Sequence, residues 1–144
     1  MVDQRLTAPP TAAPGLVEFV MMTQRRLSRG LSAVLAEESF TVEQWRIMSA
    51  LADGEGHLMG ELAESRLIPH PTLTRIVEGL VDDGLVYRRI SKADRRRVAV
   101  YLSRRGQERV VRLNARVSAQ ERALEADPEW AEIAALLRRL GAIE

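Results

Sequence analysis

The sequence predicts a mainly α-helical protein with one small β-hairpin, an α+β fold class in which helices dominate. Apolar residues recur at spacings of three and four along most of the chain, and they alternate only near residue 100. Capping residues and prolines precede the periodic segments. The 144 residues fit one domain with a single core. We expect residues 1–13, rich in Pro, Ala and Thr, to be a disordered leader and residues 14–144 to form the domain.

The composition argues against several classes of protein. The chain has no cysteine, which excludes disulfides, thiolate catalysis and thiolate metal sites. Its apolar runs are too short to span a bilayer, and residues 1–15 lack the apolar stretch of a secretion signal, so we expect a cytoplasmic protein. His57 and His70 have no cluster of potential ligands around them, so we expect neither metal nor cofactor. No catalytic pairing or phosphate-binding glycine loop is present, and we do not expect an enzyme.

Two amphipathic helices should begin the domain. An apolar seam between residues 14 and 37 predicts the first, with Leu16 and Leu35 near its ends. Thr41 and Gln44 have the spacing of a capping box, so a second helix should begin there and end near the glycines at 54 and 56. Five of its residues are expected to face inward: Val42, Trp45, Met48, Leu51 and Ala52.

Two short helices joined by a tight turn should follow. Pro71 suits the first position of the second of these helices, because the missing N–H costs nothing there, and Gly84 is placed to end it. Such a pair is typical of a helix-turn-helix. The inward residues are Leu58, Leu62 and Ala63 in the first helix, and Leu73, Ile76, Val77 and Leu80 in the second.

Residues 85–90 and 97–102 are strand-like, and the polar segment between them predicts a hairpin. In the second strand, apolar and outward residues are expected to alternate: Val98, Val100 and Leu102 against Arg97, Ala99 and Tyr101. Ser103 can cap a long helix over residues 104–126, and Asp127 with Pro128 can begin a last helix. The expected architecture is a winged helix-turn-helix over residues 41–103, flanked by terminal helices over residues 14–38 and 104–144.

The apolar seams of the terminal helices are longer than a domain of this size can cover. An amphipathic helix must bury its apolar face, and a second copy of the chain is an economical partner. We therefore expect a homodimer built from these helices. The alternative is that the first and last helices pack against each other within one monomer.

Positive charge is concentrated in one part of the chain. The net charge is +1, yet residues 88–116 carry eleven Lys or Arg against two acids. Such a patch can hold phosphates although the whole chain is nearly neutral, because screening limits each charge to about 8 Å. An ordinary solvated surface is the alternative. At the hairpin tip, we expect Asp94 to orient Arg96 toward a narrow DNA groove while Lys92 and Arg95 lie against phosphates.

The second helix of the pair can enter a major groove beside this hairpin. Arg75 can donate two hydrogen bonds to guanine, and Thr72 and Thr74 can reach a phosphate or a thymine methyl group. His70 is also a candidate DNA contact. Its alternative is a helix cap or an exposed surface residue.

Residues 61–106, "ELAESRLIPHPTLTRIVEGLVDDGLVYRRISKADRRRVAVYLSRRG", resemble the core of the MarR family of bacterial transcriptional regulators. The resemblance implies a homodimer with two winged lobes on a palindromic DNA site, and repression that a small ligand relieves. It departs from the family at Leu67, where a turn glycine is frequent, and at Pro69, where a capping serine is frequent. The stretches "EQWRI" and "LIPHPTLT" resemble the branch that controls catabolism of aromatic acids, such as the homoprotocatechuate repressors.

The resemblance also implies an effector pocket between the terminal helices and each lobe. An aromatic carboxylate would need an apolar slot and one arginine. We therefore expect a phenolic or aromatic-acid effector, and Trp45 and Met48 have core packing as their alternative role. The candidate lining residues are Met21, Met22, Arg25, Arg26, Arg29, Trp45, Arg46 and Met48.

The function predicted is that of a homodimeric repressor that binds a palindromic site in double-stranded DNA and is released by a small ligand. Two other functions are compatible with the sequence. One is a winged-helix module that acts through protein or RNA contacts. The other is a DNA-binding activator without a small-molecule ligand.

Overall fold

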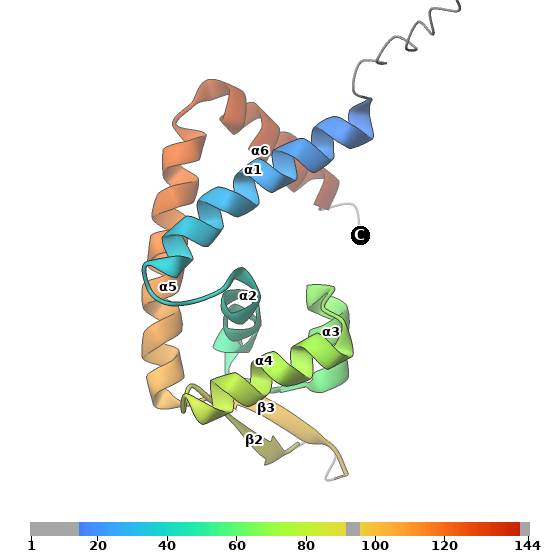
Figure 1. Ribbon diagram of the computed structural model, residues 1–144, viewed down its shortest axis with the longest axis vertical. Helices are drawn as coiled ribbons and strands as arrows, with labels where there is room; N and C mark the ends of the chain where they lie inside the picture. Colours follow the sequence, from blue (N-terminus) through green and yellow to red (C-terminus); the bar gives the residue numbers. More distant parts are fainter. Residues whose placement is uncertain (1–14, 92–95, 142–144) are drawn as a thin grey trace, which may run out of the picture.

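The computed structural model describes residues 15–91 and 96–141. Helices α1 and α6 lie at the end of the molecule opposite the small sheet, and the long helix α5 runs along one side and joins the two ends (Figure 1). The elements in chain order are α1 (Leu16–Ala36), α2 (Val42–Ala50), the 3-10 turn η1 (Leu51–Asp53), β1 (His57–Leu58), α3 (Met59–Arg66), α4 (His70–Asp82), β2 (Val86–Ile90), β3 (Val98–Leu102), α5 (Arg104–Glu125) and α6 (Pro128–Gly141). The predicted class is confirmed.

Three helix starts lie where the sequence placed their caps. The Thr41 hydroxyl accepts from the Gln44 N–H at 3.1 Å, and the Gln44 side chain accepts from the Thr41 N–H at 2.9 Å. The Ser103 hydroxyl accepts from Gly106 N–H at 3.0 Å and donates to the Gly84 carbonyl at 2.7 Å. At the start of α6, Asp127 Oδ1 accepts from the Glu129 N–H at 2.9 Å. These local signals correctly predicted the boundaries.

The core lies in the lobe formed by α2, α3, α4 and the sheet, and it continues along the first half of α5. Leu62 and Ala63 of α3 are buried as predicted. The prediction for α2 is wrong at Ala52, which lies in η1 and is exposed, while Ile47 is buried in its place. A 3-10 helix has about 3.0 residues per turn rather than 3.6, so each residue rotates further around the axis and the extrapolated apolar seam loses its phase there.

The sheet has three strands in the order β1-β3-β2, all antiparallel, where the sequence predicted a two-stranded hairpin. The expected alternation along β3 is also wrong, because Ala99 and Tyr101 are buried together with Val100 and Leu102. β3 is the central strand, and its second face is covered as well. There Tyr101 stacks on Tyr87 with ring centroids 5.5 Å apart.

Helix α4 begins at His70, one residue before the predicted start, and Pro69 is its N-cap residue. Proline at position 71 is still in the first turn, where its missing N–H removes no helical hydrogen bond. Leu67 ends α3 in the left-handed conformation, with φ 52°. The turn geometry that usually favours glycine is therefore kept here by a leucine.

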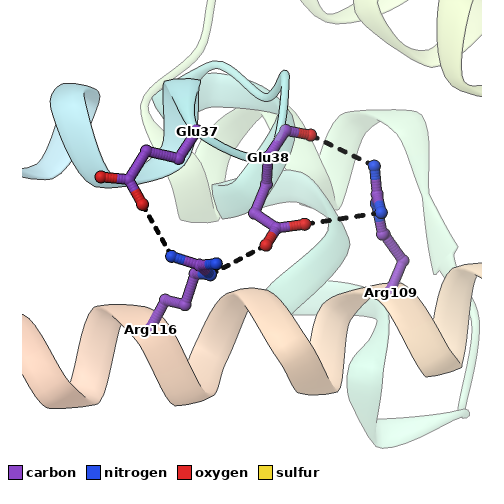
Figure 2. A network of polar contacts seen from close by, with 4 residues as sticks. All are labelled: Glu37, Glu38, Arg109 and Arg116. Carbon is purple, nitrogen blue, oxygen red and sulfur yellow. Dashed lines mark hydrogen bonds and ion pairs between the residues drawn. The ribbon is translucent and has the colours of Figure 1, made fainter.

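Four charged side chains join the end of α1 to α5 (Figure 2). Arg116 lies between two carboxylates, with its Nη1 2.7 Å from Glu37 Oε2 and its Nε 2.8 Å from Glu38 Oε1. Arg109 donates to the Glu38 carbonyl oxygen at 3.2 Å and is 3.5 Å from Glu38 Oε2. The network ties the terminal helix to the helix that reaches the lobe.

The N-terminal half of α1 and much of α6 keep large apolar side chains at the surface of the monomer. Leu16 is 80% exposed and Leu140 is 66% exposed. Contacts between α1 and α6 within the chain therefore leave these faces uncovered. The other exposed members are Val17, Phe19, Val20, Met21 and Met22 in α1, and Ile133, Leu136 and Leu137 in α6.

None of the helices within residues 15–91 and 96–141 combines the length and apolar character needed to cross a bilayer. The same described residues contain no group of three or more potential metal ligands.

Candidate nucleic-acid interface

Helix α4 presents one buried face and one solvent face. Leu73, Val77 and Leu80 are fully buried against the lobe, which leaves Arg75 exposed on the other side. Thr72 is half-buried and lines, together with Arg75, an open hollow of about 470 Å³ between α4 and the start of α2. The arrangement leaves a cationic side chain and a hydroxyl on the surface that a groove of DNA could meet.

The start of α4 carries the two other candidates of this helix. The Thr74 hydroxyl donates to the His70 carbonyl at 3.0 Å, so in the free chain it is used by the helix itself. His70 is the first helical residue and is exposed, and the N-cap residue is Pro69, whose side chain makes no cap. Of the two alternatives for His70, it is therefore a surface residue rather than the cap. The uncapped N–H groups beside it suit an anion.

The wing is formed by β2 and β3. Arg96 lies just before β3 and is exposed, as are Arg88 and Arg89 on β2. The last pair of the ladder, Ile90 opposite Val98, keeps both side chains more than half exposed. The other candidate residues of the wing, Lys92, Asp94 and Arg95, lie outside the described residues, so the expected Asp94–Arg96 contact stays a prediction.

The candidate effector residues are not brought into one pocket within the monomer. Met22 and Arg29 are exposed on α1, and the Arg26 guanidinium lies 5.8 Å from the centre of the Trp130 ring. Met21, Met22 and Arg25 line an open hollow along the first turns of α1, which no residue of α2 reaches.

On α2 the candidates are held by the lobe itself. Met48 is fully buried in the core, which is its alternative role. The Arg46 guanidinium donates to the Arg66 carbonyl at the end of α3. Trp45 is half-buried and donates from Nε1 to Asn114 Oδ1 at 2.8 Å. Of the three candidates on α2, Trp45 and Arg46 keep part of their surface accessible and Met48 does not.

Asn114 of α5 is a residue that the sequence analysis missed. Its Oδ1 accepts hydrogen bonds from Trp45 Nε1 and from the Ser49 hydroxyl, the latter at 2.9 Å. The signal available in the sequence was a polar side chain adjacent to the apolar seam of α5, with Leu113 before it and Val117 after it. Its partners lie more than 60 positions away, so periodicity alone could not pair them.

A contact between the side chains of His57 and Asp53 closes the loop before β1. His57 Nε2 lies 2.7 Å from Asp53 Oδ2, and Asp53 Oδ1 accepts from Glu55 N–H at 3.0 Å. Burial is the largest single effect and opposes ionisation of this carboxyl. The hydrogen bonds from Glu55 and His57, with electrostatic attraction from His57 and Arg66, together outweigh it, so the pKa of Asp53 lies below its ordinary value. A lowered acid pKa stabilises the fold at neutral pH, and this contribution is lost as the pH falls through the folded-state pKa.

Residues 39–97 match the sequence model of the MarR family. This segment contains the helix-turn-helix and the wing whose geometry is described above. The helix-turn-helix and wing of this chain are of the MarR type. The resemblance of residues 61–106 is thereby confirmed.

Individual MarR relatives agree with this assignment. The homoprotocatechuate degradative operon repressor of Escherichia coli is 30% identical over 93 residues, which are 65% of this chain and 63% of the repressor. The chain thus matches less than two thirds of that relative's length.

Solved MarR-type structures cover nearly the whole chain. NadR, crystallised with 4-hydroxyphenylacetate, superposes with a TM-score of 0.72 at 26% identity, covering 94% of this chain and 99% of NadR. CouR, a transcriptional repressor solved on a 23-mer DNA duplex, shares the fold with a TM-score of 0.77 at 24% identity, covering 90% and 92% of the two chains.

Proposed function

We propose that this chain is a homodimeric transcriptional repressor that binds a palindromic site in double-stranded DNA. The observation that carries the proposal is that α4, whose solvent side holds Thr72 and Arg75, packs against β2 of the wing, where Arg88 and Arg89 are exposed. A protein that places one helix in the major groove and a basic hairpin in the neighbouring groove must hold the two elements next to each other. CouR, which has the same fold, was solved on a DNA duplex.

The dimer is supported by the apolar faces of α1 and α6 that the monomer leaves exposed. Soluble monomers rarely keep large contiguous apolar faces in water, and a two-fold dimer would cover both copies at once. In such a dimer the segments 14–38 and 104–144 form the interface and 41–103 forms each DNA-binding lobe. The two lobes then read two half-sites about one helical turn apart.

The ligand that we propose to relieve repression is a phenolic or aromatic acid. The E. coli relative is named for homoprotocatechuate degradation, and NadR was crystallised with 4-hydroxyphenylacetate. In this chain, Trp45 and Arg46 are the partly accessible aromatic and cationic residues of α2, and Arg26 and Arg29 are further cations on α1. An aromatic acid requires this combination of an apolar ring contact and a guanidinium.

The DNA proposal is tested by incubating the purified protein with sheared genomic DNA and sequencing the fragments that it retains. The expected result is an inverted repeat shared by the retained fragments. Retention of no fragment at low salt, or retention without a common sequence, contradicts the proposal.

The ligand proposal is tested separately by thermal unfolding with a panel of phenolic and aromatic acids. At least one acid should stabilise the protein and lower its affinity for the retained fragments. If none stabilises a protein that still binds DNA, the chain regulates without a ligand of this class. A winged-helix module that acts through protein or RNA contacts would bind no duplex in the first experiment.

A further inference from the structure

A further hollow lies where the corner between α1 and α2 meets the first turns of α5. It has a volume of about 310 Å³, and none of the predicted DNA-contacting residues lines it. Its polar wall is made by Arg105, Arg109 and Arg112 of α5, opposite Ser39 and Gln44. The volume is at the small end of the range for ligand sites.

The three arginines follow each other at spacings of four and three, so they lie on one face of α5. Like charges at this spacing destabilise a helix unless a counter-charge is near. Arg105 and Arg112 form no ion pair with any described residue. Of the acids in the hollow, Glu108 is paired with Arg104 at 3.3 Å, which leaves the exposed Asp83 as the nearby unpaired carboxylate.

The third arginine of the hollow is only weakly neutralised. Arg109 is 3.5 Å from Glu38 Oε2, whereas Arg116 approaches the other oxygen of the same carboxylate to 2.8 Å (Figure 2). Charge-assisted hydrogen bonds are normally about 2.7–2.9 Å long, so the Glu38 carboxylate is held mainly by Arg116. The Arg109 guanidinium also lies 5.2 Å from the centre of the Phe40 ring, which keeps it in place at the wall of the hollow.

We propose that this hollow binds the phosphate group of a small molecule. Three guanidinium groups around a partly enclosed polar space provide the paired N–H donors that a phosphate dianion accepts. Serine and glutamine side chains on the opposite wall add neutral hydrogen-bonding groups. Because Arg109 also contacts Glu38 at the end of α1, an occupied hollow acts on the junction between the terminal helix and the lobe.

The test uses the full chain and sodium pyrophosphate as the probe, with sodium chloride at the same ionic strength as the reference. Thermal unfolding and calorimetry are compared for the wild type, Arg105→Gln and Arg112→Gln. The matched control is Arg122→Gln, an exposed arginine on the same helix outside the hollow. Pyrophosphate should stabilise the wild type and the control. Each hollow variant should lose about tenfold in affinity, as expected for one charge-assisted hydrogen bond.

Stabilisation by chloride equal to that by pyrophosphate would overturn the proposal, as would an equal loss in all three variants. DNA backbone is the other source of the same chemistry, and a duplex titration distinguishes it. The proposal expects the hollow variants to keep the wild-type affinity for DNA. The proposal is wrong if these variants bind pyrophosphate as the wild type does but each lowers the log–log salt slope of DNA binding by about 0.9. The arginines would then contact DNA.

Discussion

Leu67 occupies a left-handed backbone position with its side chain 86% exposed. For a residue with a Cβ this conformation destabilises the folded state by about 1–2 kcal/mol. A glycine avoids that cost, but it raises the entropy of the unfolded chain, which lowers stability by about 0.4–1 kcal/mol. The first effect is larger, and removal of an exposed side chain forfeits little burial. Leu67→Gly should therefore raise the free energy of unfolding by about 0.5–1 kcal/mol. Urea unfolding measures the change.

The matched control for this prediction is Ser65→Gly, at an exposed position inside α3. There a glycine only loosens the helix, and stability should fall by about 0.5 kcal/mol. A lower urea midpoint for Leu67→Gly would contradict the assignment of strain to this turn.

Arg75 is the residue of α4 that we expect to read a base. Arg75→Ala should weaken binding to the retained inverted repeat by about 1–3 kcal/mol and relax the preference at one base pair. Competition titrations with substituted duplexes measure both effects. Glu78→Ala, one turn away on the same helix, is the control and should not weaken binding. An equal loss for every duplex sequence would reassign Arg75 to a phosphate contact.

At the scale of elements, Gly106 sets how closely α5 approaches the strand that follows α4. A Cβ at this position would lie 2.0 Å from the Leu85 carbonyl oxygen, a backbone atom that cannot move aside alone. Gly106→Ala should therefore strongly destabilise the lobe, by about 1–3 kcal/mol or more for an overpacked site. Gly79→Ala in α4 meets no atom within 4 Å and should instead stabilise by about 0.5–1 kcal/mol. Thermal unfolding of the pair checks the opposite signs.

Besides their shared apolar core, helices α2 and α5 are linked by one acceptor, Asn114 Oδ1, which serves both Trp45 and Ser49. Asn114→Leu leaves two half-buried donors without a partner and should lower the free energy of unfolding by about 1–3 kcal/mol. Asn114→Asp keeps the acceptor and should cost less. Chemical unfolding followed by tryptophan fluorescence measures the stability of both variants. Equal stability of Asn114→Leu and the wild type would contradict the role of this acceptor.

The elements that could be predicted from the sequence are those set by neighbours in the chain. Thr41 with Gln44, and Ser103 with Gly106, make their capping hydrogen bonds within three residues, so their pattern is local. The two-residue strand β1 could not be predicted, because it exists only through pairing with β3, some 40 positions later.

The same distinction applies to the candidate site. The solvent face of α4 follows from the helical period of its apolar residues, so Arg75 was correctly expected to be exposed. The arginines of the hollow lie on a similarly regular face of α5, but the hollow itself needs the α1–α2 corner, which only the tertiary fold brings there. Asn114 was missed for the same reason.

At the scale of the whole molecule, two surfaces of opposite character are separated along the long axis. The apolar faces of α1 and α6 lie at one end, and the wing and α4 lie at the other (Figure 1). A two-fold dimer through the apolar end would present two copies of the cationic surface toward one side. The exposed arginines of α4 and of the wing, among them Arg75, Arg88 and Arg89, would then act twice on a single duplex.

The measurement that tests this most directly is a titration of the retained inverted repeat at a series of salt concentrations, with the stoichiometry read at saturation. Two protomers should bind each site, and the log–log slope should be about −5 or steeper, since each neutralised phosphate contributes about −0.9. One protomer per duplex, or an affinity that hardly changes with salt, would contradict a dimer that grips DNA through its α4 helices and wings.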